Sequence, residues 1–308
     1  MSFRRFIYYC ALCGGAAAFV AWALGEHLET GVLEDGEKGL FLGIMLGAIL
    51  AVVDSSWNFS WRQLPVAVLR VLVAGTVGCF AGFLGGLIGS WVLSNTNHEM
   101  LAAVAQVFGW TLTGLLIGAS IGLFDLVLSV LLGRNSSGAV KKVFHGLIGG
   151  GGGGLLGGVL FVLLEAGLGK LNTSSLKTSS LWTPGALGFV VLGLCIGLLV
   201  GLAQVILKQA WLKVEKGFRP GRELIVSKEQ VVIGRGEACD IGLFGDNGVE
   251  RTHARILRKG DRYLLIDADT PGGTYLNGQR IDGPTPLQAG DEIGVGRALI
   301  RFGERQKR

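Results

Sequence analysis

Charged residues are scarce in this sequence and unevenly distributed. Asp, Glu, Lys and Arg make up 17% of the 308 residues, whereas an average soluble domain contains about 25%. Residues 1–217 contain 13 basic and 10 acidic side chains, and residues 218–308 contain 15 and 13. The C-terminal segment therefore has the composition of a water-soluble domain, and the rest is depleted of charge, as membrane spans are. The formal net charge of +5 is too thinly spread to predict a nucleic-acid partner.

Histidine, cysteine and proline are also rare. The four histidines (His27, His98, His145, His253) have neither metal-ligand nor catalytic-triad spacing, so no enzyme, metal site or cofactor is expected. The five cysteines form no disulfide framework. Cys10-x-x-Cys13 has redox spacing, but it lies in an apolar run without a second pair. Before residue 218 the prolines are Pro65 and Pro184, each just ahead of an apolar run, which disfavours a transporter built on broken helices.

Long apolar runs are abundant. A bilayer core requires about 20 residues of helix, and six runs are long enough: 6–25, 39–57, 66–93, 102–132, 143–168 and 185–210. Glycine supplies 52 residues of the chain and allows helix backbones to approach closely in lipid. Six consecutive glycines at 149–154 lie inside one apolar run and precede Leu155-Leu156. Tight helix packing is therefore favoured there over a phosphate-binding loop, which carries Lys-Ser/Thr.

A spaced motif recurs within these runs. Gly-x3-Gly-x3-Ala-x2-Asp at 43–54 returns 71 residues later at 114–125, with Gly for Ala. It returns a further 79 residues on, at 193–204, with Gln in place of Asp. The predicted fold of residues 1–210 is therefore a glycine-rich membrane bundle of six helical spans, built from three two-helix repeats.

Polar groups are few inside the predicted spans. Asp54, Asp125 and Gln204 occupy equivalent positions of the repeat. Acidic groups within a membrane are functional candidates, so these three residues are the candidate membrane site. Two alternatives are open: a helix-packing or interfacial role, and an ion or proton path.

Basic residues are biased toward one side of the predicted bundle. Three lie in the loops of one side, and ten lie on the other: Arg4, Arg5, Arg62, Arg70, Arg134, Lys141, Lys142, Lys208, Lys213 and Lys216. The positive-inside rule therefore predicts a multi-pass protein of the plasma (inner) membrane with both termini in the cytoplasm. As an alternative, Arg4-Arg5 and Ala21-Trp22-Ala23 also fit a cleavable signal peptide. We favour retention of this N-terminal segment in the mature protein, because its helix completes the third two-helix repeat.

Short β-rich runs begin at residue 222, separated by Gly, Pro, Asp and Asn, as in a β-sandwich. They include Val-Ile-Gly-Arg at 232–235, Glu-Arg-Thr-His at 250–253, Gly-Thr-Tyr-Leu-Asn-Gly at 273–278 and Gly-Asp-Glu-Ile at 290–293. This order and spacing resembles the forkhead-associated (FHA) domain. The resemblance implies an all-β sandwich that binds phosphothreonine peptides and performs no chemistry. The expected domains are a transmembrane part (1–210), a juxtamembrane tether (211–221), an FHA-like domain (222–303) and a basic tail (304–308).

The resemblance implies a role for individual residues. The candidate phosphopeptide contacts are Arg235, Glu250, Arg251, Thr252, Gly272 and Thr274. The implied structural residues are Gly234 in a tight turn, His253 as a buried brace between loops, and Asn277 as a tie between loops. Glu250 replaces the family's phosphate-binding Ser, Gly272 replaces the Asn that grips the peptide backbone, and Cys239 replaces a frequent Asn. Phosphothreonine binding is therefore expected to be weakened.

These observations predict a membrane-anchored signalling or scaffold protein that presents a cytoplasmic FHA-like module. Its partners would be the lipid bilayer and a protein, recognised through phosphothreonine or through an unphosphorylated surface. The alternative is a small channel or transporter regulated by the FHA-like domain. The sequence predicts no oligomeric state.

Overall fold

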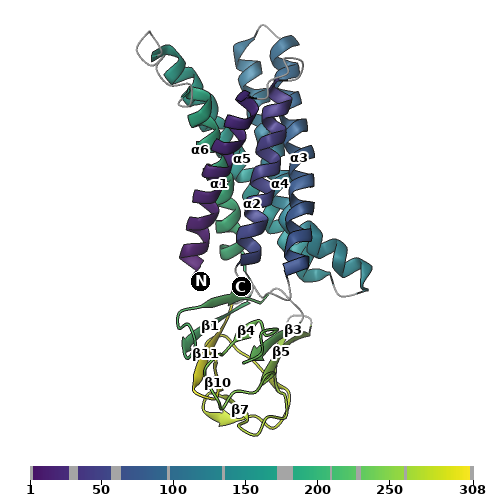
Figure 1. The fold of residues 1–308 in the computed structure, drawn as a ribbon, viewed down its shortest axis with the longest axis vertical. Coiled ribbons are helices and arrows are strands. Elements are labelled where there is room, and N and C mark those ends of the chain that lie inside the picture. Colours follow the sequence, from purple (N-terminus) through teal and green to yellow (C-terminus); the bar gives the residue numbers. More distant parts are fainter. Residues whose placement is uncertain are drawn as a thin grey trace. The chain divides into compact units, whose positions relative to one another are not determined.

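The chain divides into two compact units, a helical one and a β-rich one. The structure is a computed structural model that describes residues 3–27, 34–56, 64–95, 98–133, 136–171, 183–208, 210–226, 230–259 and 262–305. Arg4–Ser56 and Val66–Ile206 form the helical unit, and Leu207–Arg308 forms most of the other. Figure 1 shows the helices and strands of both units.

Long apolar helices make up the helical unit. They are α1 (Phe3–His27), α2 (Glu34–Ser56), α3 (Leu64–Asn95), α4 (Glu99–Leu131), α5 (Ser137–Leu171) and α6 (Pro184–Ile206). Among the described residues, these six helices are long and apolar enough, by length and composition, to cross a membrane. The prediction of six long apolar helices is therefore confirmed.

Glycines lie where the helices approach most closely. A Cβ atom on Gly43 of α2 would overlap the carbonyl oxygen of Gly78 on α3. In α4, a Cβ atom on Gly114 would overlap the Gly150 carbonyl oxygen of α5 in the same way. The third copy of the motif behaves alike, because a Cβ atom on Gly193 of α6 would overlap the Gly14 carbonyl oxygen of α1. Each of the three motif segments thus packs its first glycine on a backbone, where a larger side chain does not fit.

The six consecutive glycines lie within α5 and face two neighbours. A Cβ atom on Gly150 or Gly154 would overlap backbone carbonyl oxygens of α4. A Cβ atom on Gly149 would lie 2.6 Å from the Leu199 carbonyl oxygen, and one on Gly153 would lie 2.5 Å from the Ile196 Cα atom, both in α6. The run therefore lets α5 pack between α4 and α6, as the helix-packing interpretation expects, and it is not a loop after a strand.

The β-rich unit is a sandwich of two sheets. Its described strands are β1 (Ala210–Lys216), β2 (Glu223–Ile225), β3 (Gln230–Gly234), β4 (Ile241–Gly242), β5 (Ala254–Lys259), β6 (Arg262–Asp267), β7 (Thr274–Leu276), β8 (Gln279–Arg280), β9 (Thr285–Pro286), β10 (Glu292–Val295) and β11 (Ala298–Glu304). One sheet has the order β2-β1-β11-β10-β7-β8 and the other β4-β3-β5-β6-β9. Alternate residues of the strands face inward, and the fully buried core includes Leu212, Ile233, Leu265, Ile293 and Phe302. The predicted β-sandwich is confirmed.

The structure differs from the prediction at the proposed tether, residues 211–221. Ala210–Lys216 form β1, which pairs with β11 and β2 in the middle of a sheet. Leu212 and Val214 are buried, whereas Trp211 and Lys213 are partly exposed. Residues 211–216 of the proposed tether therefore belong to a strand, whose side chains alternate between the core and the surface.

Candidate functional site

Two loops that carry predicted contact residues are joined by backbone hydrogen bonds. The N–H of Arg235, after β3, donates to the Glu250 carbonyl oxygen at 2.9 Å, and Gly236 N–H donates to the Arg251 carbonyl oxygen at 3.0 Å. The thiol of Cys239 donates to that same oxygen at 3.0 Å. A Cβ atom on Gly234 would overlap it as well. Close approach of the 250–251 backbone, rather than turn geometry, therefore requires glycine at position 234.

His253 connects this pair of loops to the loop after β6. The ring is fully buried, and its Nδ1 accepts a hydrogen bond from the Glu250 backbone N–H at 3.1 Å. Because Nδ1 is the acceptor, the proton of the neutral ring lies on Nε2. Nε2 donates to the Gly273 carbonyl oxygen at 3.1 Å and also lies 3.2 Å from Thr270 Oγ1. His253 therefore holds the backbones of positions 250 and 273 at a fixed separation.

Thr274, a predicted contact residue, is buried. Its side chain is fully buried and donates to Asp267 Oδ1 at 2.5 Å. Thr270 donates to the same carboxylate through its backbone N–H at 2.8 Å and its hydroxyl at 2.9 Å. Burial raises the pKa of Asp267, but these hydrogen bonds outweigh burial and hold the pKa below its usual range.

Asp267 was missed by the sequence analysis, although a local signal existed. An Asp that ends a strand and is followed by turn residues commonly accepts backbone hydrogen bonds from those residues. In this chain Asp267 ends β6 and precedes the turn that contains Thr270. Asp267 and Thr270 therefore belong with His253 to the support of the candidate site.

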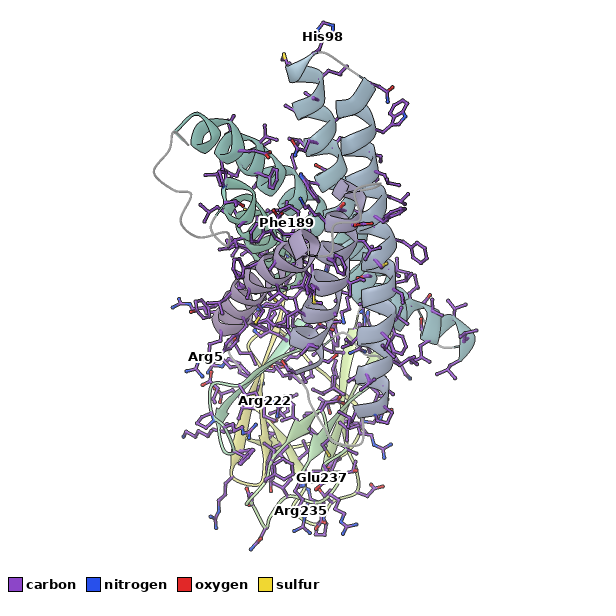
Figure 2. The ribbon with its side chains drawn as sticks, turned by 45° about the horizontal axis from the view of Figure 1, so that its top comes forward. Arg5, His98, Phe189, Arg222, Arg235 and Glu237 are labelled. Atoms are coloured by element: carbon purple, nitrogen blue, oxygen red, sulfur yellow. The ribbon has the colours of Figure 1, made fainter. Side chains whose placement is uncertain are left out.

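The exposed part of the candidate site carries both signs of charge. Arg235 Nη2 lies 3.9 Å from Glu250 Oε2, and these side chains are 44% and 47% exposed. Arg251 is exposed and Thr252 partly so. Figure 2 shows Arg235 with the neighbouring Glu237 at one end of the sandwich. An ion pair this exposed stabilises the fold little, but it places a carboxylate next to the guanidinium that would meet an anionic ligand.

Gly272 and Asn277 occupy different environments. Gly272 is exposed, and a Cβ atom there would lie 3.3 Å from the Gly248 carbonyl oxygen. Asn277 (φ 50°) and Gly278 (φ 83°) form the β7–β8 turn, whose left-handed geometry favours an Asn-Gly pair. The Asn277 side chain donates to Asp291 Oδ1 and accepts from Glu292 N–H, both at 2.9 Å. Asn277 thus connects its turn to the start of β10.

Comparison with known proteins identifies this part of the chain. Residues 231–296 match the family model described as FHA domain. This segment is an FHA domain. The chain is 34% identical over 93 residues to the oxoglutarate dehydrogenase inhibitor of Corynebacterium jeikeium (strain K411), covering 30% of this chain and 63% of that protein.

A second curated relative agrees with this assignment. The chain is 30% identical over 93 residues to the glycogen accumulation regulator GarA of Mycolicibacterium smegmatis, covering 30% of this chain and 58% of that protein. It thus spans less than two thirds of either curated relative. A structure solved for the analysis of phosphothreonine-dependent FHA domain interactions is 28% identical, with 32% of this chain and 99% of that chain covered and a TM-score of 0.30.

Two of the membrane candidates, Asp54 and Asp125, lie together in the helical unit. Arg70 Nη2 is 2.5 Å from Asp125 Oδ1, and Arg70 Nη1 is 3.9 Å from Asp54 Oδ2. Lys142 Nζ is 2.6 Å from Asp54 Oδ2 and 3.1 Å from Asp125 Oδ2. These four side chains, which we call the charge quartet, come from α2, α3, α4 and α5 and are 14–26% exposed.

The sequence analysis counted both cations of the quartet among the basic residues of one side and did not place them with Asp54 and Asp125. The signal that could have found them is spacing, because Arg70 and Lys142 are 72 residues apart and Asp54 and Asp125 are 71 residues apart. Gln204, at the third equivalent position, is buried in α6 and carries no charge. The structure therefore brings two of the three candidate membrane residues together.

Proposed function

We propose that this chain is a membrane-anchored scaffold or signalling protein whose FHA domain recruits a protein partner. Residues 1–210 would span the membrane, and the FHA domain with β1 would lie in the cytoplasm. Six helices of sufficient length and apolarity and the ten-to-three bias of basic residues support this arrangement. The named relatives are an inhibitor and a regulator, which supports a binding role without catalysis. Two reporters that are active on only one side of the membrane test the topology, one fused after residue 308 and one inserted within 94–100. If both report the same side, the topology is wrong.

The observation that carries the proposal is the exposed pair Arg235 and Arg251 on loops braced by His253. Guanidinium groups bind phosphate through paired donors, so the site can attract a phosphothreonine. Glu250 opposes this, because it lacks the serine donor and places a carboxylate near Arg235. Loss of the serine hydrogen bond to phosphate at position 250 costs about 1.5–3 kcal/mol. Loss of the asparagine hydrogen bond to the peptide backbone at position 272 costs about 1 kcal/mol. Together, roughly 2.5–4 kcal/mol would weaken a ~1 μM ligand to about 0.07–1 mM.

Calorimetry with a degenerate phosphothreonine peptide library tests this proposal. The full-length protein in detergent is compared with the double variant Glu250→Ser/Gly272→Asn, and Glu237→Ser serves as the control for losing a nearby exposed carboxylate. We expect weak binding by the parent and the control, and a gain of about 100-fold or more in the double variant. Micromolar, phosphate-dependent binding by the parent would refute the weakened site. No binding by either would assign recognition to an unphosphorylated partner.

A channel or transporter is the second candidate function, because acidic groups lie inside the apolar helices. The charge quartet favours the scaffold, since each carboxylate is held by two cations and the quartet carries no net charge. Reconstituted vesicles provide the test. We expect no ion flux above empty vesicles from either the parent or Asp125→Asn. A flux in the parent that the substitution abolishes would establish the channel.

A further inference from the structure

The turn between β1 and β2 holds an arginine in an unfavourable backbone conformation. Residues 217–221 contain three positive φ angles, at Gly217 (114°), Arg219 (56°) and Gly221 (80°). Glycine adopts such angles freely, whereas an L side chain in the left-handed region costs about 1–2 kcal/mol. Arg219 is exposed, so core packing does not explain its presence. Residues held in such conformations cluster at binding sites.

One aromatic ring lies under this arginine, and a second ring packs against the first. The Arg219 guanidinium carbon is 5.1 Å from the centre of the Phe218 ring, within the range of a cation–π contact. The Phe218 ring meets the Phe244 ring edge to face, with centres 5.2 Å apart. Phe244 remains 42% exposed, although a ring of this size is a large apolar side chain to leave in water. The turn therefore presents apolar surface and positive charge side by side.

A second arginine adds positive charge next to this surface. Arg222 Nη2 donates to the Asp240 carbonyl oxygen at 3.1 Å. Burial, and then the positive charge of the nearby Arg219, lower the pKa of Arg222, against an opposing effect of Asp240. The Asp240 carboxylate accepts the Val232 backbone N–H at 3.0 Å. Two like charges held close together favour an acidic group as the occupant.

The surface borders the loops of the candidate phosphopeptide site. Arg222 contacts the end of the β3–β4 loop at Asp240, and Phe244 begins the loop that ends with Glu250 and Arg251. Figure 2 shows Arg222 on the same sandwich as Arg235 but apart from it. The surface therefore shares no residue with the candidate phosphopeptide contacts.

We propose that Phe218, Arg219 and Phe244 form a second contact surface of the FHA domain. It binds an unphosphorylated stretch of a protein partner that combines acidic side chains with a large apolar side chain. The acidic groups pair with Arg219 and Arg222, and the apolar group covers Phe244. The proposal rests on the proposed function only in taking the partner to be a protein, and it does not require phosphothreonine to bind.

The test uses the full-length protein in an uncharged detergent and a fluorescent peptide without phosphate, Gly-Asp-Glu-Phe-Asp-Glu-Gly. The key variant is Arg219→Gly, because glycine relieves the left-handed backbone while removing the charge. Phe244→Ser removes the exposed ring. Arg258→Ser is the matched control, because Arg258 also lies over an aromatic ring, that of Tyr263, at 5.8 Å.

We expect the parent protein to bind the peptide in a salt-sensitive manner. It should not bind a peptide in which Lys replaces each Asp and Glu. Arg219→Gly and Phe244→Ser should each weaken binding about five-fold or more, with Arg219→Gly unfolding at the same or a higher temperature. Arg258→Ser should bind as the parent does, because Arg258 lies outside this surface. Equal binding by Arg219→Gly and the parent would overturn the proposal. Binding to vesicles rich in phosphatidylserine but not to the peptide would also overturn it, in favour of a lipid surface.

Discussion

Removing Lys142 should destabilise the helical unit strongly. Lys142 Nζ lies 2.6 Å from Asp54 Oδ2 and 3.1 Å from Asp125 Oδ2. In Lys142→Met, the cation still near Asp54 among the described residues is Arg70, whose Nη1 is 3.9 Å away. Breaking a buried ion pair from one side costs about 3–5 kcal/mol, because a charge remains buried without compensation.

The partner substitutions reveal whether the quartet acts as a unit. Neutralising both sides of one bridge in Asp54→Asn/Lys142→Met leaves Arg70 and Asp125 paired at 2.5 Å. We therefore expect the double variant to be more stable than the sum of the single effects by about 1 kcal/mol or more. Exchanging the charges in Asp54→Lys/Lys142→Asp should recover part of the loss.

Thermal unfolding in detergent, followed by circular dichroism, measures these effects. A loss of 3–5 kcal/mol corresponds to a fall in Tm on the order of 10 °C for a unit of this size. Lys141→Met is the matched control, because it removes the adjacent positive charge outside the quartet. Additive effects of Asp54→Asn and Lys142→Met, with no recovery on charge exchange, would refute the reasoning.

Three further predictions concern packing, the loop brace and acid stability. Gly118→Leu should separate α4 from α5, since even a Cβ atom there would overlap the Gly146 carbonyl oxygen; unchanged thermal stability in detergent would contradict this. His253→Ala leaves the Glu250 N–H and Gly273 carbonyl oxygen without their ring partner, so the FHA domain should lose about 2–4 kcal/mol, measured by denaturant unfolding, with Arg255→Ala as the exposed control. The folded pKa of Asp267 is below its usual range, so its contribution is present above the unfolded pKa and is lost as pH falls through the folded pKa. Asp267→Asn should therefore show a flatter loss of stability below about pH 4 than the parent, and identical acid-unfolding curves would argue against this role.

Hydropathy and spacing predicted the architecture because they depend on local composition. The six apolar runs became helices, and the motifs from 232 to 293 lie on a sandwich. Asp54 and Asp125 were predicted as a pair of equivalent positions, but their cations were not, because Arg70 and Lys142 meet them only through packing of four helices.

Three other features depend on contacts that the sequence alone does not display. Trp211 and Lys213 lie in the predicted tether, and pairing with β11 makes this segment a strand. Thr274 matches a ligand-contact position in the motif, but its hydroxyl donates to Asp267 below the loop. The glycine at 234 was interpreted as a turn residue, and the structure shows a backbone passing over it.

The glycine run of α5 has a consequence for how the protein assembles. Six glycines lower the intrinsic helix propensity of residues 149–154 by roughly 5–6 kcal/mol relative to alanine. Since their faces contact α4 and α6, these neighbours supply the contacts that keep the segment helical. In the chain α4 precedes the run and α6 follows it, so both supports are present only once α6 has been synthesised. A chain that stops after residue 171 would leave this helix without one of its two supports.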